Sequence, residues 1–184
     1  MSLKYRNYLE FLMGQEKDVV KEISVAGGVI VSKTSEGTQR ILLIKRSKKD
    51  HWPNIWEFPR GKCDHGPNEK LFPCLKREVY EETGLHIEPI KFIDKYEYIA
   101  DEGKRRSTQY NYLCRMDDQK QKVKLSKEHD EFMWIMSFGE VELLVPSEMK
   151  KTISKVLNLD KKIVDYPEND NSEETIEEYL KGIQ

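Results

Sequence analysis

Apolar residues are grouped along the chain into short runs that predict β-strands. Residues 25–31 and 41–44 are apolar or β-branched, and a Ser-Glu-Gly turn between them predicts a hairpin. Residues 87–99 and 108–116 are rich in isoleucine, phenylalanine and tyrosine, and an Asp-Glu-Gly-Lys turn between them predicts a second hairpin. Residues 132–136 predict one more short strand.

Two segments late in the chain have the spacing of helices. They are residues 138–144 and residues 147–157, the second with Ser147 as its expected N-cap. Together with a helix predicted between the two hairpins, these segments place helices on either side of the strands in sequence. The pattern therefore predicts an α/β fold.

The helix between the hairpins has clear ends. Proline is tolerated only in the first turn of a helix, so Pro73 predicts a start at residue 71 or 72, and Gly84 predicts the end. The face of this helix that packs on the sheet is expected to carry Cys74, Leu75 and Val79.

Composition indicates one main domain. The chain has 184 residues, of which 38% are hydrophobic, and a net charge of -2 that gives no general attraction for nucleic acid or anionic membranes. We expect this domain to span residues 22–162. Residues 1–21 predict a helical extension that packs on the domain or on a second subunit, which would make a homodimer, and residues 163–184 form an acidic tail.

The cysteines and the hydropathy pattern bear on location. No run of eighteen apolar residues and no charged leader with a cleavage site is present, so no membrane association is expected. Cys63, Cys74 and Cys114 lack metal-ligand spacing, and their odd number leaves one unpaired. These features are typical of reduced cysteines in the cytoplasm.

Carboxylates are concentrated on the central helix. Glu78, Glu81 and Glu82 are three and four residues apart, so they share one patch beside Arg77, and Glu69 lies just upstream. Like charges this close repel and favour a bound cation. Magnesium is held by carboxylates, waters and substrate phosphates, so the patch predicts phosphate chemistry. Taken alone, however, Arg-Glu-x-x-Glu-Glu more often marks a solvated helix face.

The context changes that interpretation. An apolar run, Trp-Glu-Phe-Pro-Arg-Gly-Lys over residues 56–62, precedes the helix, and Gly84 follows it. This order resembles the signature of the Nudix hydrolases, and residues 69–85 match that signature throughout. Between Gly61 and Glu69 there are seven residues, two more than in the family pattern, which we interpret as an insertion of residues 67 and 68. The resemblance implies the Nudix fold, an α/β/α sandwich with a mixed sheet and a loop-helix-loop motif.

The resemblance also implies a metal site. Glu81 and Glu82 are similar to the family's main ligands for Mg²⁺ or Mn²⁺, and Glu78 to a further ligand or to the base that orients water. Arg77 is expected to orient Glu78 through a charge-assisted hydrogen bond. The main-chain carbonyl of Arg60, the residue before the signature glycine, is expected to be another ligand.

The remaining candidate residues are proposed for substrate binding and for the role of general base. Arg60, Lys62 and Trp52 are candidate substrate-binding residues, Lys62 for a phosphate and Trp52 for a base, although Trp52 can also be a core or edge aromatic. Some relatives take their general base from a later loop, where this chain has Glu128 and Glu131, the latter slightly preferred. A role as plain loop charges is equally compatible with both. His129 is expected at the surface.

Substrate class is left open between two resemblances. Trp-Glu-Phe-Pro is similar to MutT-like enzymes that hydrolyse nucleoside triphosphates. Phe-Pro-Arg-Gly-Lys followed by the acidic helix resembles mRNA-decapping and dinucleoside-polyphosphate members. Because no basic face is evident for a long RNA, we expect a small nucleotide with a diphosphate linkage. The alternatives are mRNA decapping and a non-catalytic nucleotide-binding module, and the second is disfavoured because all the glutamates are present.

Overall fold

A mixed β-sheet forms the centre of the molecule. The computed structural model describes residues 21–50, 52–64, 69–140 and 145–158. The strands are β1 (Lys21–Lys33), β2 (Gln39–Arg46), β3 (Trp56–Glu57), β4 (Arg60–Lys62), β5 (Ile87–Ala100), β6 (Arg105–Met116) and β7 (His129–Ile135). The helices are α2 (Leu71–Thr83), α3 (Ser147–Asn158) and two short 3-10 helices, η1 (Asp101–Gly103) and η2 (Phe138–Glu140).

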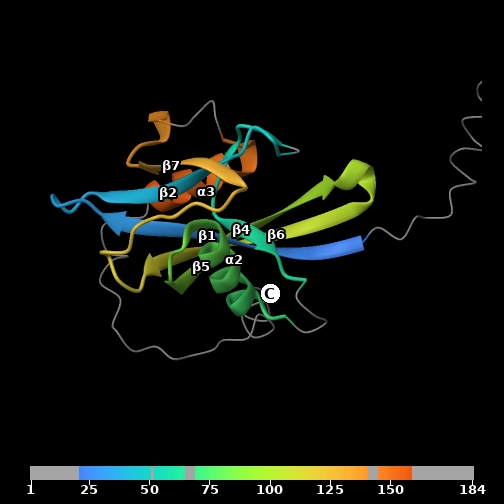
Figure 1. Ribbon diagram of the computed structural model, residues 1–184, viewed down its shortest axis with the longest axis horizontal. Helices are drawn as coiled ribbons and strands as arrows, with labels where there is room; N and C mark the ends of the chain where they lie inside the picture. Colours follow the sequence, from blue (N-terminus) through green and yellow to red (C-terminus); the bar gives the residue numbers. More distant parts are fainter. Residues whose placement is uncertain (1–20, 51, 65–68, 141–144, 159–184) are drawn as a thin grey trace, which may run out of the picture.

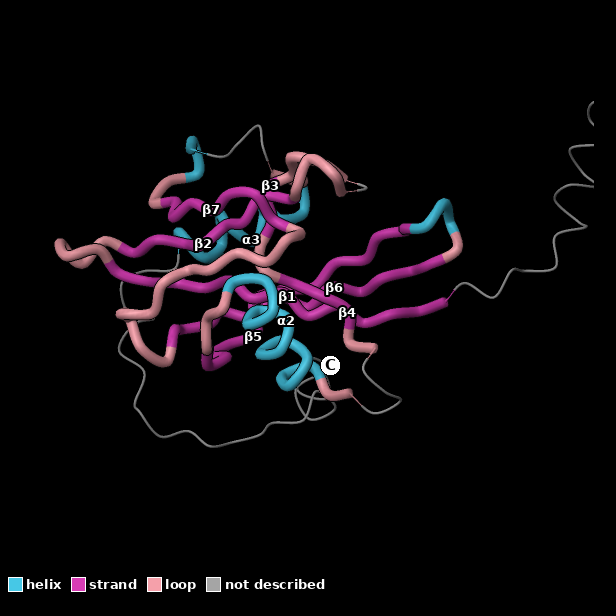
Figure 2. The backbone as a smooth tube through the Cα atoms, viewed as in Figure 1, coloured by secondary structure: helices cyan, strands magenta, loops and turns pink. Residues whose placement is uncertain are grey.

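The strand order is β3-β2-β1-β6-β5, with β4 paired to β1 and β7 paired to β2. The pairing of β1 with β6 is parallel, and the other pairings are antiparallel. Figure 1 shows α2 in front of this sheet and α3 behind it, and Figure 2 shows β1, β5 and β6 running beyond the other strands at one end. The predicted α/β/α sandwich with a mixed sheet is confirmed.

Each face of the sheet has its own apolar core. On the α2 side the core contains Ala26, Ile30, Leu42, Leu71, Cys74, Leu75, Val79, Leu85, Ile87, Tyr112, Cys114 and Met116. On the α3 side it contains Val29, Val31, Ile41, Leu43, Trp56, Phe58, Leu113, Ile135, Val145, Met149, Ile153 and Val156. Neighbouring residues of β1 and β2 divide between the two cores, because side chains alternate across a strand and both faces are covered.

Helix α2 has the predicted bounds and orientation. It begins at Leu71, two residues before Pro73, and is closed by Gly84, which has a φ of 67° and whose N–H donates to the carbonyl of Tyr80. Gly28 lets the helix lie close to β1, because a Cβ there would be 2.9 Å from a methyl group of Val79. The predicted packing face is buried, so the glutamates are left on other faces of the same helix.

Most other predicted elements are present. The hairpins β1–β2 and β5–β6 form as expected, and α3 fits the predicted helix at 147–157. Of the helix predicted at 138–144, the described part is the short 3-10 helix η2, and residues 141–144 lie outside the described residues. Residues 1–20 and 159–184, which hold nearly all of the predicted extension and the tail, also lie outside them. None of the described helices combines the length and the apolar character needed to span a bilayer.

The cysteines differ from the sequence-based expectation. A disulfide joins Cys63, just after β4, to Cys74 on α2, with their Cα atoms 5.3 Å apart, whereas Cys114 is free and buried. The expectation of reduced cysteines is therefore wrong for this pair. Cys74 lies on the inward face of α2, and the packing of that face against β1 and β4 brings it to Cys63.

Reducing the Cys63–Cys74 bond should lower the stability of the fold. A cross-link that closes a loop of this size stabilises a protein by about 3 kcal/mol, mainly by restricting the unfolded chain. We expect reductant to lower the urea midpoint of the wild type and to leave that of the Cys63→Ala/Cys74→Ala variant unchanged. Equal wild-type midpoints with and without reductant, together with three titratable thiols in the unfolded protein, would contradict this assignment.

Candidate active site

Arg77 organises the acidic face of α2. Its guanidinium contacts both oxygens of Glu69 at 3.0 and 3.1 Å, Glu78 at 2.7 Å and Glu81 at 3.2 Å, and it donates to the carbonyl of Lys62 at 3.1 Å. The predicted contact between Arg77 and Glu78 is therefore present. Glu69 also reaches this cluster, so the insertion before it does not displace it from the motif.

Glu78 lies directly against the backbone of β4. A Cβ placed on Gly61 would overlap the carboxylate of Glu78, so the glycine provides the space for that carboxylate. Burial raises the pKa of Glu78 above its ordinary value; Arg77 opposes the shift, and the charges of Glu81 and Glu69 add to it.

Glu82 is the most deeply buried carboxylate of the helix. One of its oxygens accepts a hydrogen bond from the main-chain N–H of Arg60 at 2.8 Å. Burial, followed by the charge of Glu57, raises the pKa of Glu82 well above its ordinary value, although the Arg60 N–H lowers it and Glu78 raises it further. Negative charge is thus concentrated where β4 meets α2, and a cation bound there would relieve it.

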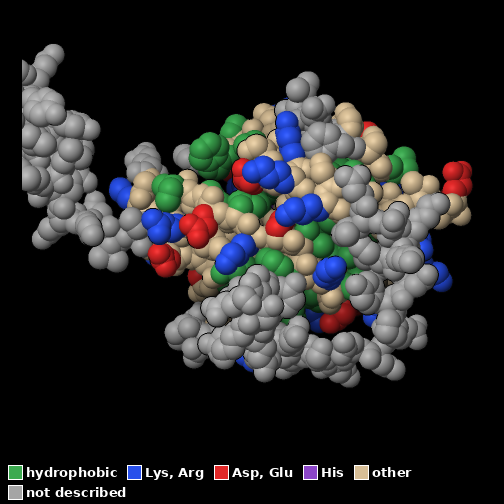
Figure 3. Space-filling view, turned by 180° about the vertical axis from the view of Figure 1, so that it is seen from behind, with side chains coloured by type: hydrophobic (Ala, Val, Ile, Leu, Met, Phe, Trp, Pro, Cys, Tyr) green, Lys and Arg blue, Asp and Glu red, His purple; other side chains and the backbone are tan. Residues whose placement is uncertain are grey.

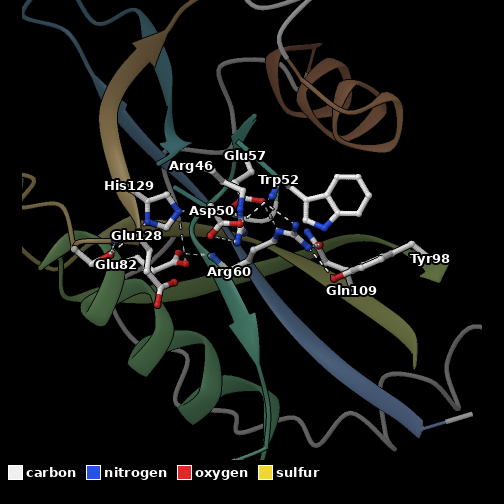
Figure 4. Close-up of polar contacts among 11 residues, drawn as sticks. Arg46, Asp50, Trp52, Glu57, Arg60, Glu82, Tyr98, Gln109, Glu128 and His129 are labelled. Carbon is white, nitrogen blue, oxygen red and sulfur yellow. Dashed lines mark hydrogen bonds and ion pairs between the residues drawn. The ribbon is translucent and has the colours of Figure 1, made fainter. Parts of the chain in front are cut away.

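Glu57 on β3 carries the opposite balance of charge. It is buried between Arg46, whose Nη1 is 2.7 Å from one oxygen, and Arg60, whose Nε and Nη2 are 2.9 and 2.8 Å from the other (Figure 4). Burial alone would raise its pKa, but Arg60, His129 and Arg46 together lower the pKa of Glu57 to about 2. Arg46 is in turn held by Asp50 at 2.7 Å. Glu57 is therefore ionised and fixed.

His129 is buried, so the expectation of a surface histidine is wrong. Its side chain is 1% exposed, and its Nε2 lies 3.6 Å from Glu57 and 3.8 Å from Glu82 (Figure 4). These distances are too long for hydrogen bonds, and among the described residues Nε2 has no hydrogen-bond partner. Its Nδ1 lies 3.4 Å from the hydroxyl of Ser126.

Glu57 and His129 are the residues that sequence reasoning missed. The signal for Glu57 was available, because a charged residue between two apolar ones, Trp56 and Phe58, in a short strand is expected to be buried and paired. His129 gave no such signal, since charged residues surround it in sequence. It is buried because β7 contains a bulge: Lys45 pairs with Glu131 and Arg46 with His129, so Asp130 is skipped.

The two candidate bases occupy different surroundings. Glu131 forms an ion pair with Lys45 at 2.8 Å, and that lysine lies over the ring of Trp56. Glu128 is exposed, and its carbonyl accepts a hydrogen bond from the main-chain N–H of Ser47. The segment just before Glu128 is bonded to the end of α2, because the N–H groups of Lys124 and Ser126 donate to the carbonyls of Thr83 and Glu82.

The candidate substrate-binding residues differ in exposure and in their contacts within the protein. The guanidinium of Arg60 donates to Tyr98 and Gln109 at 2.8 Å as well as to Glu57, so its donors are occupied within the protein. Lys62 has an exposed side chain at the end of β4. Trp52 lies in the loop between β2 and β3 with 56% of its surface exposed (Figure 4).

The carboxylates on α2 have the chemistry of a divalent cation site, although the described residues do not form a metal-binding arrangement. Within the described ranges, no three His, Cys, Asp or Glu side chains converge in a geometry that would hold an ion. Arg77 binds Glu78 and Glu81, and a cation would have to compete with it for them. The raised pKa values of Glu78 and Glu82 nevertheless fit a hard cation with oxygen ligands, and Gly61 lets the carboxylate of Glu78 lie against β4.

Comparison with known proteins identifies the family. The model of the NUDIX domain matches residues 24–157, which is most of the chain. The chain belongs to the Nudix family. It is a Nudix pyrophosphohydrolase, an enzyme that acts on phosphoric anhydrides.

Its relatives act on two kinds of nucleotide. The chain is 26% identical over 130 residues to the asymmetrical bis(5'-nucleosyl)-tetraphosphatase of Mus musculus, covering 68% of this chain and 84% of the relative. It is 35% identical over 79 residues to the 8-oxo-dGTP diphosphatase of Buchnera aphidicola subsp. Schizaphis graminum, covering 43% of this chain and 55% of the relative.

Solved Nudix structures share the fold. The C. elegans Ap4A hydrolase in a binary complex has a TM-score of 0.61 at 23% identity and covers 73% of this chain and 94% of that one. The MutT protein of Methanosarcina mazei Go1 has a TM-score of 0.60 at 23% identity and covers 74% of this chain and 94% of that one.

A double-mutant cycle tests whether Gly61 makes space for Glu78 in this Nudix enzyme. We expect Gly61→Ala to destabilise the metal-free protein by about 1–3 kcal/mol in urea unfolding, because the added methyl group displaces the carboxylate. In a Glu78→Ala background the same change should cost little. Gly139→Ala, where a Cβ meets no atom within 4 Å, is the matched control. An equal cost of Gly61→Ala in both backgrounds would show that the contact does not exist.

Proposed function

We propose that this Nudix enzyme hydrolyses a diphosphate linkage in a small nucleotide by a reaction that requires Mg²⁺ or Mn²⁺. The single observation that carries the proposal is that the carboxylates of Glu78 and Glu82 both lie against the backbone of β4, the first at Gly61 and the second at the N–H of Arg60. One of these carboxylates is partly buried and the other is buried, and burial raises the pKa of both, which provides the electrostatic basis for binding a divalent cation. When bound, such an ion lowers the pKa of a water molecule and neutralises charge on the departing phosphate.

Named residues of the chain are proposed to bind the metal and to orient its ligands. Glu78, Glu81 and Glu82 and the carbonyl of Arg60 are the proposed ligands. Arg77 orients Glu78 through the 2.7 Å contact. The N–H of Arg60 fixes one oxygen of Glu82, so that carboxylate is oriented before any ligand binds.

The proposed substrate contacts are made by exposed residues. Lys62 is the proposed phosphate contact, because its side chain is exposed and its main-chain carbonyl accepts a hydrogen bond from Arg77, which also contacts the carboxylates. Trp52 is the proposed base contact, because it is largely exposed in the loop between β2 and β3. Arg60 acts on the substrate indirectly, since its guanidinium is already bound by Glu57, Tyr98 and Gln109.

We propose Glu128, rather than Glu131, as the general base. Glu128 follows a segment that is hydrogen-bonded to the last turn of α2, whereas the carboxylate of Glu131 is paired with Lys45. The sequence slightly favoured Glu131 as the base, but the ion pair of Glu131 with Lys45 reverses that preference. A base must come within hydrogen-bond reach of the attacking water, and of the two glutamates Glu128 is the one held next to the acidic helix.

Among substrates, we propose a dinucleoside polyphosphate first and an oxidised nucleoside triphosphate second. The match to the mouse tetraphosphatase covers most of both chains, whereas the match to the Buchnera diphosphatase covers less than half of this chain. Either substrate would be split into two phosphate-bearing products.

Longer nucleic acid and pure binding are less well supported. The net charge is -2, and on the face seen in Figure 3 separate Lys and Arg side chains stand among acidic and apolar ones, which does not favour a capped RNA. A non-catalytic binding module is disfavoured because every signature glutamate is retained. The cytoplasmic location and the homodimer stay predictions, and the Cys63–Cys74 bond weakens the cysteine argument for the former.

A panel of nucleotides tests the proposal and the choice of base. We expect the wild type with Mg²⁺ to hydrolyse dinucleoside tetraphosphate or 8-oxo-dGTP, and Glu82→Gln to release product no faster than buffer. Glu128→Gln should lower kcat by about 10²-fold or more, as expected for a general base, whereas the matched control Glu131→Gln should remain near the wild type. Product formation is measured by chromatography.

Two results would contradict the proposed function or the choice of base. Equal rates for the wild type and Glu82→Gln would remove the catalytic role of the acidic helix. A larger loss in Glu131→Gln than in Glu128→Gln would return the role of base to Glu131.

A further inference from the structure

His129 lies between two carboxylates that have different environments. Glu57 is bound by Arg46 and Arg60, whereas the carboxylate of Glu82 receives one main-chain N–H, from Arg60. The two carboxylates repel each other, and this repulsion is the second cause, after burial, of the raised pKa of Glu82. The imidazole Nε2 is 3.6 Å from one and 3.8 Å from the other.

The position of this nitrogen needs an explanation beyond packing. It is buried and has no hydrogen-bond partner among the described residues, and a buried polar atom in that state costs free energy. An N–H group on Nε2 is attracted to both carboxylates at once. The opposite nitrogen, Nδ1, faces the hydroxyl of Ser126 at 3.4 Å and can accept a hydrogen bond from it. This arrangement favours the tautomer with the proton on Nε2.

The segment that carries His129 is also bonded to the main chain of Glu82. The N–H of Ser126 donates to the carbonyl of Glu82 at 3.0 Å, and the N–H of His129 donates to the carbonyl of Ser126. Residues 126–129 therefore reach Glu82 both at its backbone and at its carboxylate. Glu128, the proposed base, lies inside this same segment.

We propose that His129 is a positioning residue. Its Nε2–H attracts and aligns the carboxylate of Glu82, and its place in the segment bonded to Glu82 keeps Glu128 beside the acidic helix. It does not contact the substrate. This role rests on the proposed function, because it assigns His129 to the support of the ligand Glu82 and of the base Glu128. Residues that orient a metal ligand commonly affect activity or metal affinity about 10- to 100-fold.

Two substitutions separate this role from simple space filling. His129→Met fills a similar volume without a donor, and His129→Gln supplies an N–H near the place of Nε2. We expect both to change the urea midpoint by a similar amount. His129→Met should lower kcat and weaken binding of Mn²⁺ alone, measured by electron paramagnetic resonance, each by about 10-fold or more, whereas His129→Gln should recover most of both. KM should change little in either. His86→Met, at an exposed histidine, is the control.

A second readout needs neither metal nor substrate. Long-range proton–nitrogen correlation spectra of the metal-free protein should show His129 protonated at Nε2, with a resonance that shifts in Glu82→Gln. If the wild type hydrolyses nothing in the panel, the proposed function fails, and these spectra still decide the alignment of Glu82 by His129.

The proposal about His129 is overturned by either of two results. One is a His129→Met enzyme with the kcat and Mn²⁺ affinity of the wild type. The other is an unprotonated Nε2 in the metal-free protein. If His129→Met does not fold, His129→Gln and the spectra of the wild type decide between the same outcomes.

Discussion

The repulsion among carboxylates at the junction of α2 and β4 is the constraint on which the rest of the site depends. Glu82 is buried there and Glu78 is partly buried; burial raises the pKa of each, and the charges of neighbouring carboxylates add to the shift. Burying such groups costs free energy unless they are paired. The structure limits that cost with Arg77, with the N–H of Arg60 and with the space left by Gly61, and it leaves the region attractive to a cation.

The two faces of α2 explain why this cost is tolerated. Cys74, Leu75 and Val79 pack on the sheet beside Gly28, and a disulfide ties the helix to the end of β4. The apolar face and the covalent link stabilise the helix, so its acidic face does not have to. The carboxylates of the proposed metal site can therefore repel one another without unfolding the helix, because other residues provide its stability.

The sequence predicted what local rules determine. Pro73 and Gly84 marked the ends of α2, and the apolar runs marked both hairpins. It did not predict the burial of His129, because that depends on a bulge in β7 and on partners at positions 57 and 82, far away in sequence. The Cys63–Cys74 bond was missed for a similar reason, since it depends on where the helix packs.

The most direct measurement is the number of protons released when Mn²⁺ binds to the metal-free protein, obtained by titration calorimetry in buffers of different ionisation enthalpy. The pKa values of Glu78 and Glu82 lie above the ordinary value and a cation requires the ionised carboxylates, so binding should release more protons as the pH is lowered toward those pKa values. The account predicts proton release in the wild type and less in Glu82→Gln. Binding with no proton release, or with equal release in both proteins, would contradict it.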